Sequence, residues 1–478
     1  MNTSRSTDSS GSTDPLAFHG GALGALAPLF LFLAGVAWLG LSGAPDERGL
    51  WPLLVAGIGL GAVLAKDRSR YADALTRGMA RPLVAVMVLA WMLAGILSTL
   101  LAKSGVLPAM VRVASDIGLS GGGFVVAAFL VGALLSTATG TSLGTLLLTV
   151  PLIFPAATTL GADPALLLGA LLGGATFGDN ISPISDTTIA SAGTQRAPLG
   201  DVVRSRMRYA LPAAAVACLL YAIFGGAGAT EAGSTSATVL DTSDAELGAL
   251  FMLLAPGAVL VCLLRRQALA VSLLAGVFVA VALGLGLGRF GFADLIYVDQ
   301  ENFIARGLLA DGIEKSVGVV VLTLFLMALA GAIEESGLVE RLLERARASA
   351  RDARKAEGWI FAAISAAVLL TTQSGVAILT VGRFTLDLGE RFGIPGPRRA
   401  NLLDVTSCTY PFLLPYFIPT ILASSLSSSG ESLGVERVSA WSAGLLNFHS
   451  WGLLALVVFA VVTGWGRQAE ETRGDASA

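Results

Sequence analysis

The stretch Gly173-Gly-Ala-Thr-Phe-Gly-Asp-Asn-Ile-Ser-Pro-Ile-Ser-Asp-Thr-Thr188 carries two aspartates, Asp179 and Asp186, directly after an apolar run of helix length that begins at Pro164. The 478-residue chain around it has the composition of a polytopic membrane protein, because 54% of its residues are hydrophobic and only 14% are charged, against about 25% charged in a typical soluble domain. A carboxylate at bilayer depth costs about 2.5–3.5 kcal/mol on insertion scales, so it persists mainly where it contacts ions, protons or substrate. The stretch therefore predicts a transport site inside the membrane.

The same stretch predicts a broken helix. Pro183 lacks an amide hydrogen and disfavours helical backbone at Ser182. Ser185 or Asp186 could then cap a second half-helix that begins at Thr187. The carbonyl end of the first half-helix would add partial negative charge at the break. Carbonyl, hydroxyl and carboxylate oxygens suit a hard monovalent cation, whereas transition metals favour His or Cys.

A carboxylate at such a break can bind either a proton or a cation. Burial disfavours the charged form of the carboxyl group, so a proton and a sodium ion would compete for its oxygens. Mutual exclusion at a site that alternates between two faces is sufficient for exchange. The alternative is structural, since either aspartate could only cap a helix or pair with an arginine, and Asp186 suits a cap as well as a site.

Apolar runs elsewhere predict ten membrane crossings, near 24–43, 50–65, 82–102, 164–192, 208–227, 248–264, 268–288, 316–335, 401–425 and 442–464. Lys and Arg gather in four connecting segments, 66–81, 193–208, 336–358 and 390–399, whereas 228–247 contains neither. Basic loops stay in the cytoplasm. The charge distribution therefore predicts a multi-pass protein of the plasma (inner) membrane with both termini cytoplasmic.

The two halves of the chain share three features in the same order. Met92–Leu107 and Leu324–Val339 both end an apolar run in Ser-Gly followed by two aliphatic residues. Each is followed by a segment rich in hydroxyl residues and Gly, 137–144 or 371–375, and then by an aspartate and hydroxyl residues inside an apolar run, the second at Asp404–Pro411. The predicted topology sends the halves across the membrane in opposite directions, and inverted repeats with broken helices are typical of secondary transporters.

This topology also makes 121–160 and 359–389 re-entrant hairpins that enter from opposite faces. The predicted fold is thus an all-α polytopic membrane protein with two inverted repeats, re-entrant hairpins and broken transmembrane helices. Its predicted parts are a disordered N-terminal tail (1–15), peripheral N-terminal helices (16–80), a first transport repeat (81–230), linking helices and loops (231–315), a second inverted repeat (316–465) and a C-terminal tail (466–478).

The segment Gly174–Thr188 resembles the signature of the NhaC family of sodium/proton antiporters, G-A-x-F-G-D-K-x-S-P-x-S-D-T-T. The resemblance extends more loosely over Arg81–Trp465 and implies a sodium/proton antiporter with a fold similar to the ion-transporter superfamily. Asn180 stands where the family often has Lys, and Leu403-Asp404 stands where it tends to have Glu-Asp. Because both departures change the charge at the proposed site, a sodium- or proton-coupled transporter or exchanger of an organic acid or amino acid, as some relatives are, stays the alternative.

The candidate residues come from the break, from the second aspartate and from the two hairpin tips. The predicted ion- and proton-binding residues are Asp179, Asn180, Ser182, Ser185, Asp186, Thr187, Asp404 and Thr406. The predicted hairpin tips, which would meet the substrate, are Thr139, Gly140, Thr141 and Ser142 in the first half and Thr372, Gln373, Ser374 and Gly375 in the second. Arg383 and Asp387 lie four apart and could neutralise each other, although an arginine near a tip could instead hold a substrate carboxylate.

The sequence favours no enzyme and no cofactor. Gly140–Gly144 fits the G-x-S-x-G nucleophile motif, but that motif needs a strand–turn–helix setting and a partner histidine. The only histidines are His19 and His449, both near terminal helices. The predicted partners are the lipid bilayer, sodium and protons as transported species, and for the alternative a small organic anion. No nucleic-acid surface or metal other than sodium is predicted, and a homodimer is left open.

Overall fold

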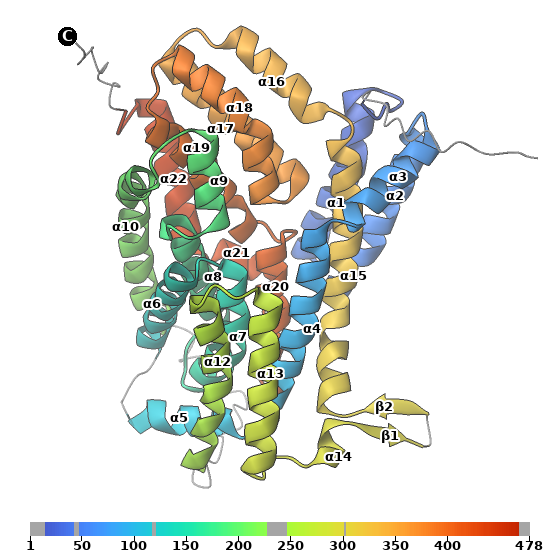
Figure 1. The fold of residues 1–478 in the computed structure, drawn as a ribbon, viewed down its shortest axis with the longest axis vertical. Helices are drawn as coiled ribbons and strands as arrows, with labels where there is room; N and C mark the ends of the chain where they lie inside the picture. Colours follow the sequence, from blue (N-terminus) through green and yellow to red (C-terminus); the bar gives the residue numbers. More distant parts are fainter. Residues whose placement is uncertain (1–14, 43–46, 117–120, 227–245, 301–302, 468–478) are drawn as a thin grey trace, which may run out of the picture.

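Helices account for most of the computed structural model, which describes residues 15–42, 47–116, 121–226, 246–300 and 303–467 (Figure 1). Within these ranges, nine helices are long and apolar enough to cross a membrane. The polytopic all-α class predicted from composition is confirmed. The predicted tails 1–15 and 466–478 and the loop 228–247 lie almost entirely outside the described residues.

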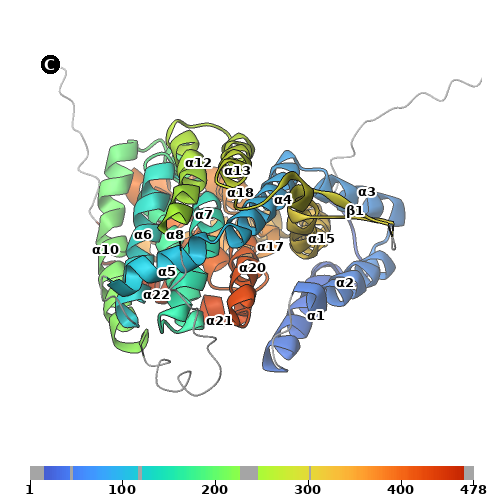
Figure 2. The same ribbon diagram turned by 90° about the horizontal axis from the view of Figure 1, so that it is seen from below.

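Three N-terminal helices lie at the edge of the molecule beside α15 (Figure 2). They are α1 (Ala22–Leu41), α2 (Trp51–Leu64), which follows the short 3-10 turn η1 (Glu47–Leu50), and α3 (Arg68–Met79). Asp67 caps α3 by accepting bonds from the amides of Ser69 and Arg70, both at 3.0 Å, as expected for an N-cap aspartate. Tyr71 of α3 donates a hydrogen bond to the Ile58 carbonyl (3.0 Å), and burial raises the pKa of Tyr71 to about 12.

Two long helices, α4 (Pro82–Lys103) and α15 (Leu308–Glu334), pack against each other in antiparallel orientation. Arg81 at the start of α4 pairs with Glu334 at the end of α15, and Ser316 donates to the Trp91 carbonyl (2.8 Å). α15 begins at Leu308, before the predicted boundary at 316. The polar residues of its first two turns are therefore helical as well.

The first half of the chain continues as α5 (Val106–Asp116), α6 (Gly122–Thr139), α7 (Ser142–Thr159), α8 (Pro164–Ile181), α9 (Asp186–Thr194) and α10 (Leu199–Phe224). α6 and α8 pack closely. Gly174 and Gly178 allow this approach, since a Cβ atom at either would run into the backbone of α6 or into Ser136. Small residues at helix interfaces serve the same purpose in other membrane proteins.

The linking region contains η2 (Leu247–Leu253), α12 (Leu254–Leu264), α13 (Leu269–Gly286) and α14 (Phe292–Leu295), followed by a two-stranded antiparallel hairpin of β1 (Tyr297–Asp299) and β2 (Ile304–Arg306). Val298 of β1 lies opposite Ala305 of β2. No strand is predicted here from the sequence. The hairpin is a small exposed addition to a helical protein, at the end of the molecule where α5 and α14 also lie (Figure 1).

The second half contains α16 (Leu338–Ser349), α17 (Ala353–Thr371), α18 (Ser374–Arg391), α19 (Gly396–Ser407), η3 (Tyr410–Phe412), α20 (Ile418–Leu426), η4 (Ser427–Leu433), α21 (Ala440–Leu445) and α22 (Phe448–Thr463). The basic helices α3 and α16 lie at the end of the molecule opposite to α5 and the β hairpin (Figure 1). Helical hairpins occur in both halves where they were predicted, as α6–α7 and α17–α18. The inverted relation of the halves stays a prediction.

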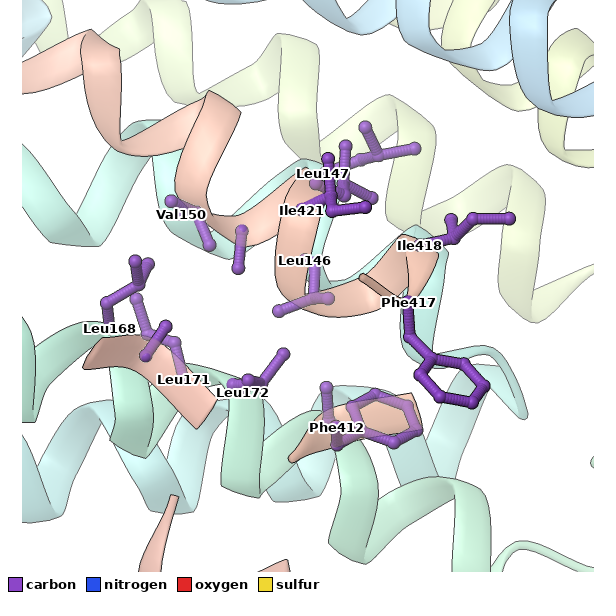
Figure 3. Close-up of a cluster of buried hydrophobic side chains, with 14 of the residues drawn as sticks. Leu146, Leu147, Val150, Leu168, Leu171, Leu172, Phe412, Phe417, Ile418 and Ile421 are labelled. Carbon is purple, nitrogen blue, oxygen red and sulfur yellow. The ribbon is translucent and has the colours of Figure 1, made fainter. Parts of the chain in front are cut away.

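A core of aliphatic and aromatic side chains holds the first hairpin against elements of the second half (Figure 3). It joins Leu146 of α7 and Leu171 of α8 to Phe412, Phe417 and Ile421, which lie in and around η3 and α20 (Figure 3). All five side chains are buried. This packing fixes the position of α7, and therefore of the hairpin tip at its start, relative to the second half of the chain.

Candidate functional site

The helix that contains Asp179 breaks where the sequence predicts. α8 ends at Ile181 and α9 begins at Asp186, with Ser182 in an extended backbone conformation before Pro183. Ser182 also donates a hydrogen bond to the Thr137 carbonyl (2.8 Å), which ties the break to the end of α6. The missing amide of Pro183 and the conformational restriction on the residue before it explain the position of the break.

Asp179 lies at this break and accepts two hydroxyl hydrogen bonds. Ser142 donates to one carboxylate oxygen and Ser185 donates to the other, each at 2.9 Å. Ser185 occupies the N-cap position of α9 without making a side-chain cap, while Asp186 accepts a bond from the Thr187 amide (2.9 Å). Asp179 is only 8% exposed as a residue, yet part of it reaches a cavity.

This cavity has a volume of about 250 Å³ and lies where both hairpin tips meet the break. Asp179 and Asp186 are its acidic lining residues, and none of its described lining residues is basic. The predicted site residues that line this cavity are Asp179, Asp186, Thr187, Gly140, Thr141, Ser142, Thr372, Gln373, Ser374 and Gly375. Leu83, Met87, Phe412 and Ile418 add an apolar wall.

The two tips achieve the same reversal with different residues. Gly140 has φ +70° and leaves no room for a Cβ atom against Ile184, so glycine is required there. In the second tip the left-handed residue is Thr372, with φ +56°, whereas a Cβ atom at Gly375 would meet nothing. The expectation that glycine allows close approach therefore applies to the first tip only. The helices that follow the tips, α7 and α18, both direct their N-terminal ends at the cavity.

Six predicted site residues do not line the cavity. Ser182 and Ser185 make hydrogen bonds at the break, to the Thr137 carbonyl and to Asp179, but do not line the cavity. Thr139 bonds within its own helix, to the Leu135 carbonyl (2.8 Å). The Asn180 side chain donates to the Thr176 carbonyl (2.9 Å) within its own helix, and its side-chain oxygen has no partner in the described structure. Thr406 is buried, likewise with no partner for its hydroxyl among the described residues.

Asp404, the remaining predicted ion-binding residue, lies behind the cavity in an ion pair with Arg206. Neither side chain is exposed at all. Thr188 (3.1 Å) and Ser191 (3.3 Å) of α9 donate hydroxyl bonds to the same oxygen of Asp404. Asp404 therefore already has a positively charged side chain as its partner inside the protein.

Arg206 is the residue that the sequence analysis missed. It was counted with the basic segment 193–208 as part of a cytoplasmic loop, but α10 begins at Leu199 and buries the Arg206 side chain completely. Its guanidinium donates to the Asn180 carbonyl (2.5 Å), the Thr188 hydroxyl (2.8 Å) and the Asn401 side chain (2.9 Å), so it joins α8, α9, α10 and α19. A signal was present: Arg206 lies on the helical stripe of α10 that also carries Val202, Tyr209, Ala213 and Ala217.

Arg383 is remote from the cavity. Its side chain is 78% exposed and pairs with Asp387 at 3.1 Å, four residues further along α18. The predicted pairing is confirmed. Because Arg383 does not line the cavity, it is not placed to hold a substrate there.

Comparison with known proteins shows that residues 30–226 match the Na+/H+ antiporter family. The chain is similar to the Na(+)/H(+) antiporter NhaC of Alkalihalophilus pseudofirmus, at 26% identity over 61% of this chain and 64% of that protein. It is also similar to the arginine/ornithine antiporter ArcD of Halobacterium salinarum, at 26% identity over 64% of each chain. A third relative is the malate-2H(+)/Na(+)-lactate antiporter of Bacillus subtilis, at 28% identity over 35% of each chain. The chain thus spans less than two thirds of the length of each of these relatives.

Proposed function

We propose, on the premise that this chain belongs with the NhaC-type members of the Na+/H+ antiporter family, that it is a secondary active transporter exchanging sodium ions for protons. The protein would lie in the inner membrane with both termini in the cytoplasm, since its basic helices gather at one end and basic segments stay inside. The exchange would proceed by alternating access, with Asp179 as the carboxylate that binds either ion.

The observation that carries this proposal is the placement of Asp179 between two hydroxyl donors at the edge of a cavity. Its charge is not neutralised by any basic residue among the described lining of that cavity. Hydroxyl and carboxylate oxygens are ligands that a hard cation prefers. A cavity of about 250 Å³ is also far larger than the roughly 10–15 Å³ of probe volume that one water needs, so a sodium ion could enter with part of its hydration shell.

Binding of a proton and of sodium would exclude each other at Asp179. Burial disfavours a bare carboxylate, so the site would be occupied by one ion or the other when the cavity changes face. Asp186 could contribute a second carboxylate from the opposite side of the break. The apparent affinity for sodium should worsen as the pH falls, because a protonated carboxyl group cannot ligate the metal ion.

Proton flux in reconstituted vesicles tests the proposal. The purified chain is placed in vesicles that contain a pH-sensitive dye, and a sodium or lithium gradient is imposed without any organic solute. Protons are expected to move in the direction opposite to that of sodium or lithium. The apparent affinity for sodium is expected to be lower at lower pH. Absence of flux under these conditions, from protein that is correctly inserted, would contradict sodium/proton exchange.

The alternative is a sodium- or proton-coupled exchanger of an organic acid or amino acid. The apolar wall of the cavity, with Met87 and Phe412, and the N-terminal ends of α7 and α18 favour it, because helix N-termini attract carboxylates. Two of the relatives are antiporters of organic solutes by their names. Adding arginine, ornithine, malate or lactate to the vesicles separates the two functions, since proton flux that appears only with one of these solutes would favour the alternative.

A further inference from the structure

A second polar pocket, of about 310 Å³, lies between α10 and α19. Arg204 and Arg208 of α10 and Arg398 of α19 line it, together with Asp201, Ser205 and Asn401. The pocket also reaches Gly466, just after α22. None of these pocket residues takes part in the proposed sodium/proton exchange.

Arg398 is held rigidly in the wall of this pocket. It is buried and pairs with Glu357 of α17 at 3.2 Å, and it donates to the Tyr209 hydroxyl and to the Trp465 carbonyl (3.0 Å). Arg467 also pairs with Glu357, at 2.7 Å. Two arginines therefore share one carboxylate, which leaves this cluster with a net positive charge.

The two arginines of α10 add charge that is not balanced. Arg204 and Arg208 are both exposed, and neither has an ion-pair partner among the described residues. The described lining of the pocket contains three arginines, Arg204, Arg208 and Arg398, and one carboxylate, Asp201. α19 begins at Gly396 next to this pocket, so the positive end of its dipole faces the same space.

We propose that this pocket binds a phosphate-bearing anion, either the headgroup of an anionic phospholipid or a free phosphate. Arginine guanidinium groups pair with phosphate oxygens through two parallel hydrogen bonds, and Ser205 and Asn401 offer further polar groups at the pocket wall. Basic pockets between membrane helices at the cytoplasmic side are suited to lipid headgroups.

The surroundings of the pocket suit the lipid source in particular. Met207 and Leu211 of α10 are exposed apolar residues adjacent to Arg204 and Arg208 along the helix, and acyl chains could cover them. Asn401 connects the pocket to the centre of the molecule, because its side chain accepts from Arg206 (2.9 Å) and donates to Ser205 (2.6 Å). A bound anion would therefore stabilise the packing of α10 against α19.

Thermal unfolding of the full chain in neutral detergent micelles tests this site without measuring transport, so its outcome is independent of the antiport proposal. The probes are phosphatidylglycerol, phosphatidylcholine and glycerol 3-phosphate, each titrated separately. Phosphatidylglycerol is expected to raise the unfolding midpoint by about 2–4 °C, and phosphatidylcholine is expected to have no such effect. Glycerol 3-phosphate distinguishes the sources, since an equal shift with this soluble probe would identify a free phosphate ester as a sufficient ligand.

Paired variants make the test specific. Arg204→Gln with Arg208→Gln should reduce the apparent affinity for phosphatidylglycerol at least about tenfold, and both positions are exposed, so folding should be unaffected. The matched control is Lys66→Gln with Arg68→Gln, which removes the same charge from two exposed residues around the start of α3 and should behave as the native chain. The proposal is overturned if neither anionic probe shifts the midpoint, or if native, variant and control proteins respond equally.

Discussion

Asp179 and Asp404 are both aspartates followed by hydroxyl residues inside an apolar run, but their surroundings are opposite in character. Asp179 accepts bonds from two serines and reaches a cavity whose described lining includes no basic residue. Asp404 is completely buried, and Arg206 pairs with it. Of the two aspartates, only Asp404 has a buried cation as its partner in the described structure, and we therefore propose Asp179 as the ion-binding carboxylate.

The difference has a physical basis in desolvation. A buried ion pair is stable only when both charges keep their partners, and removal of one partner leaves an uncompensated charge in the interior. A buried carboxylate without a cation can instead take up a proton. We therefore expect Asp179 to exchange ions and Asp404 to hold α10 against α19.

Asp179→Asn is expected to reduce coupled flux at least about a hundredfold, because the amide keeps the shape of the side chain but cannot exchange a proton. Flux in vesicles measures the loss, and size-exclusion chromatography of the purified variant verifies folding. Near-normal pH-dependent flux would reduce Asp179 to a structural residue and remove the contrast with Asp404.

Asp404→Asn is expected to destabilise the protein by about 3–5 kcal/mol, because it leaves the charge of Arg206 buried without its partner. The double variant Arg206→Met with Asp404→Leu should recover most of this stability, since apolar residues of similar volume can replace a buried pair. Unfolding midpoints and flux are measured for both. A double variant that folds well but transports nothing would show that Asp404 itself binds the transported ion.

Ser142→Ala removes one of the two hydroxyl donors of Asp179 and is expected to lower the apparent sodium affinity about fivefold, the equivalent of one hydrogen bond of about 1 kcal/mol. The control is Thr158→Val in the same helix, whose hydroxyl bonds to the Phe154 carbonyl (2.8 Å) and not to the cavity. Sodium dependence of the flux rate is the measurement. Equal behaviour of the two variants would argue that the tip does not contribute to the site.

Arg383→Ala is expected to have the smallest effect, a loss of stability of about 0.3–0.5 kcal/mol, as is usual for an exposed pair four residues apart on a helix. The choice of transported ion should stay the same, because Arg383 lies outside the cavity. Flux with sodium, lithium and organic solutes checks this. A loss of organic-solute flux in this variant alone would return Arg383 to the substrate site.

The local features of the site could be predicted because each depends on a few neighbouring residues. Pro183 after Ser182 breaks the helix by its own chemistry, and Gly140 reverses the chain because it lacks a Cβ atom. The role of Asp404 could not be predicted in this way. The charge of Arg206 was assigned to a loop from its neighbours in the sequence, whereas its environment depends on where α10 begins and on what packs against it.

The sequence alone determined that this is a helical membrane protein, that the helix containing Asp179 breaks at Ser182, and that two hairpins reverse at hydroxyl-rich tips. These properties follow from hydrophobicity, backbone conformation and residue spacing, which are local. That Ser142 and Thr372 line one cavity with Asp179, and that Arg206 pairs with Asp404, depends instead on how the helices pack in three dimensions. Those contacts join residues far apart in the chain, and packing between helices selects them because a buried charge must find its partner wherever the fold places one.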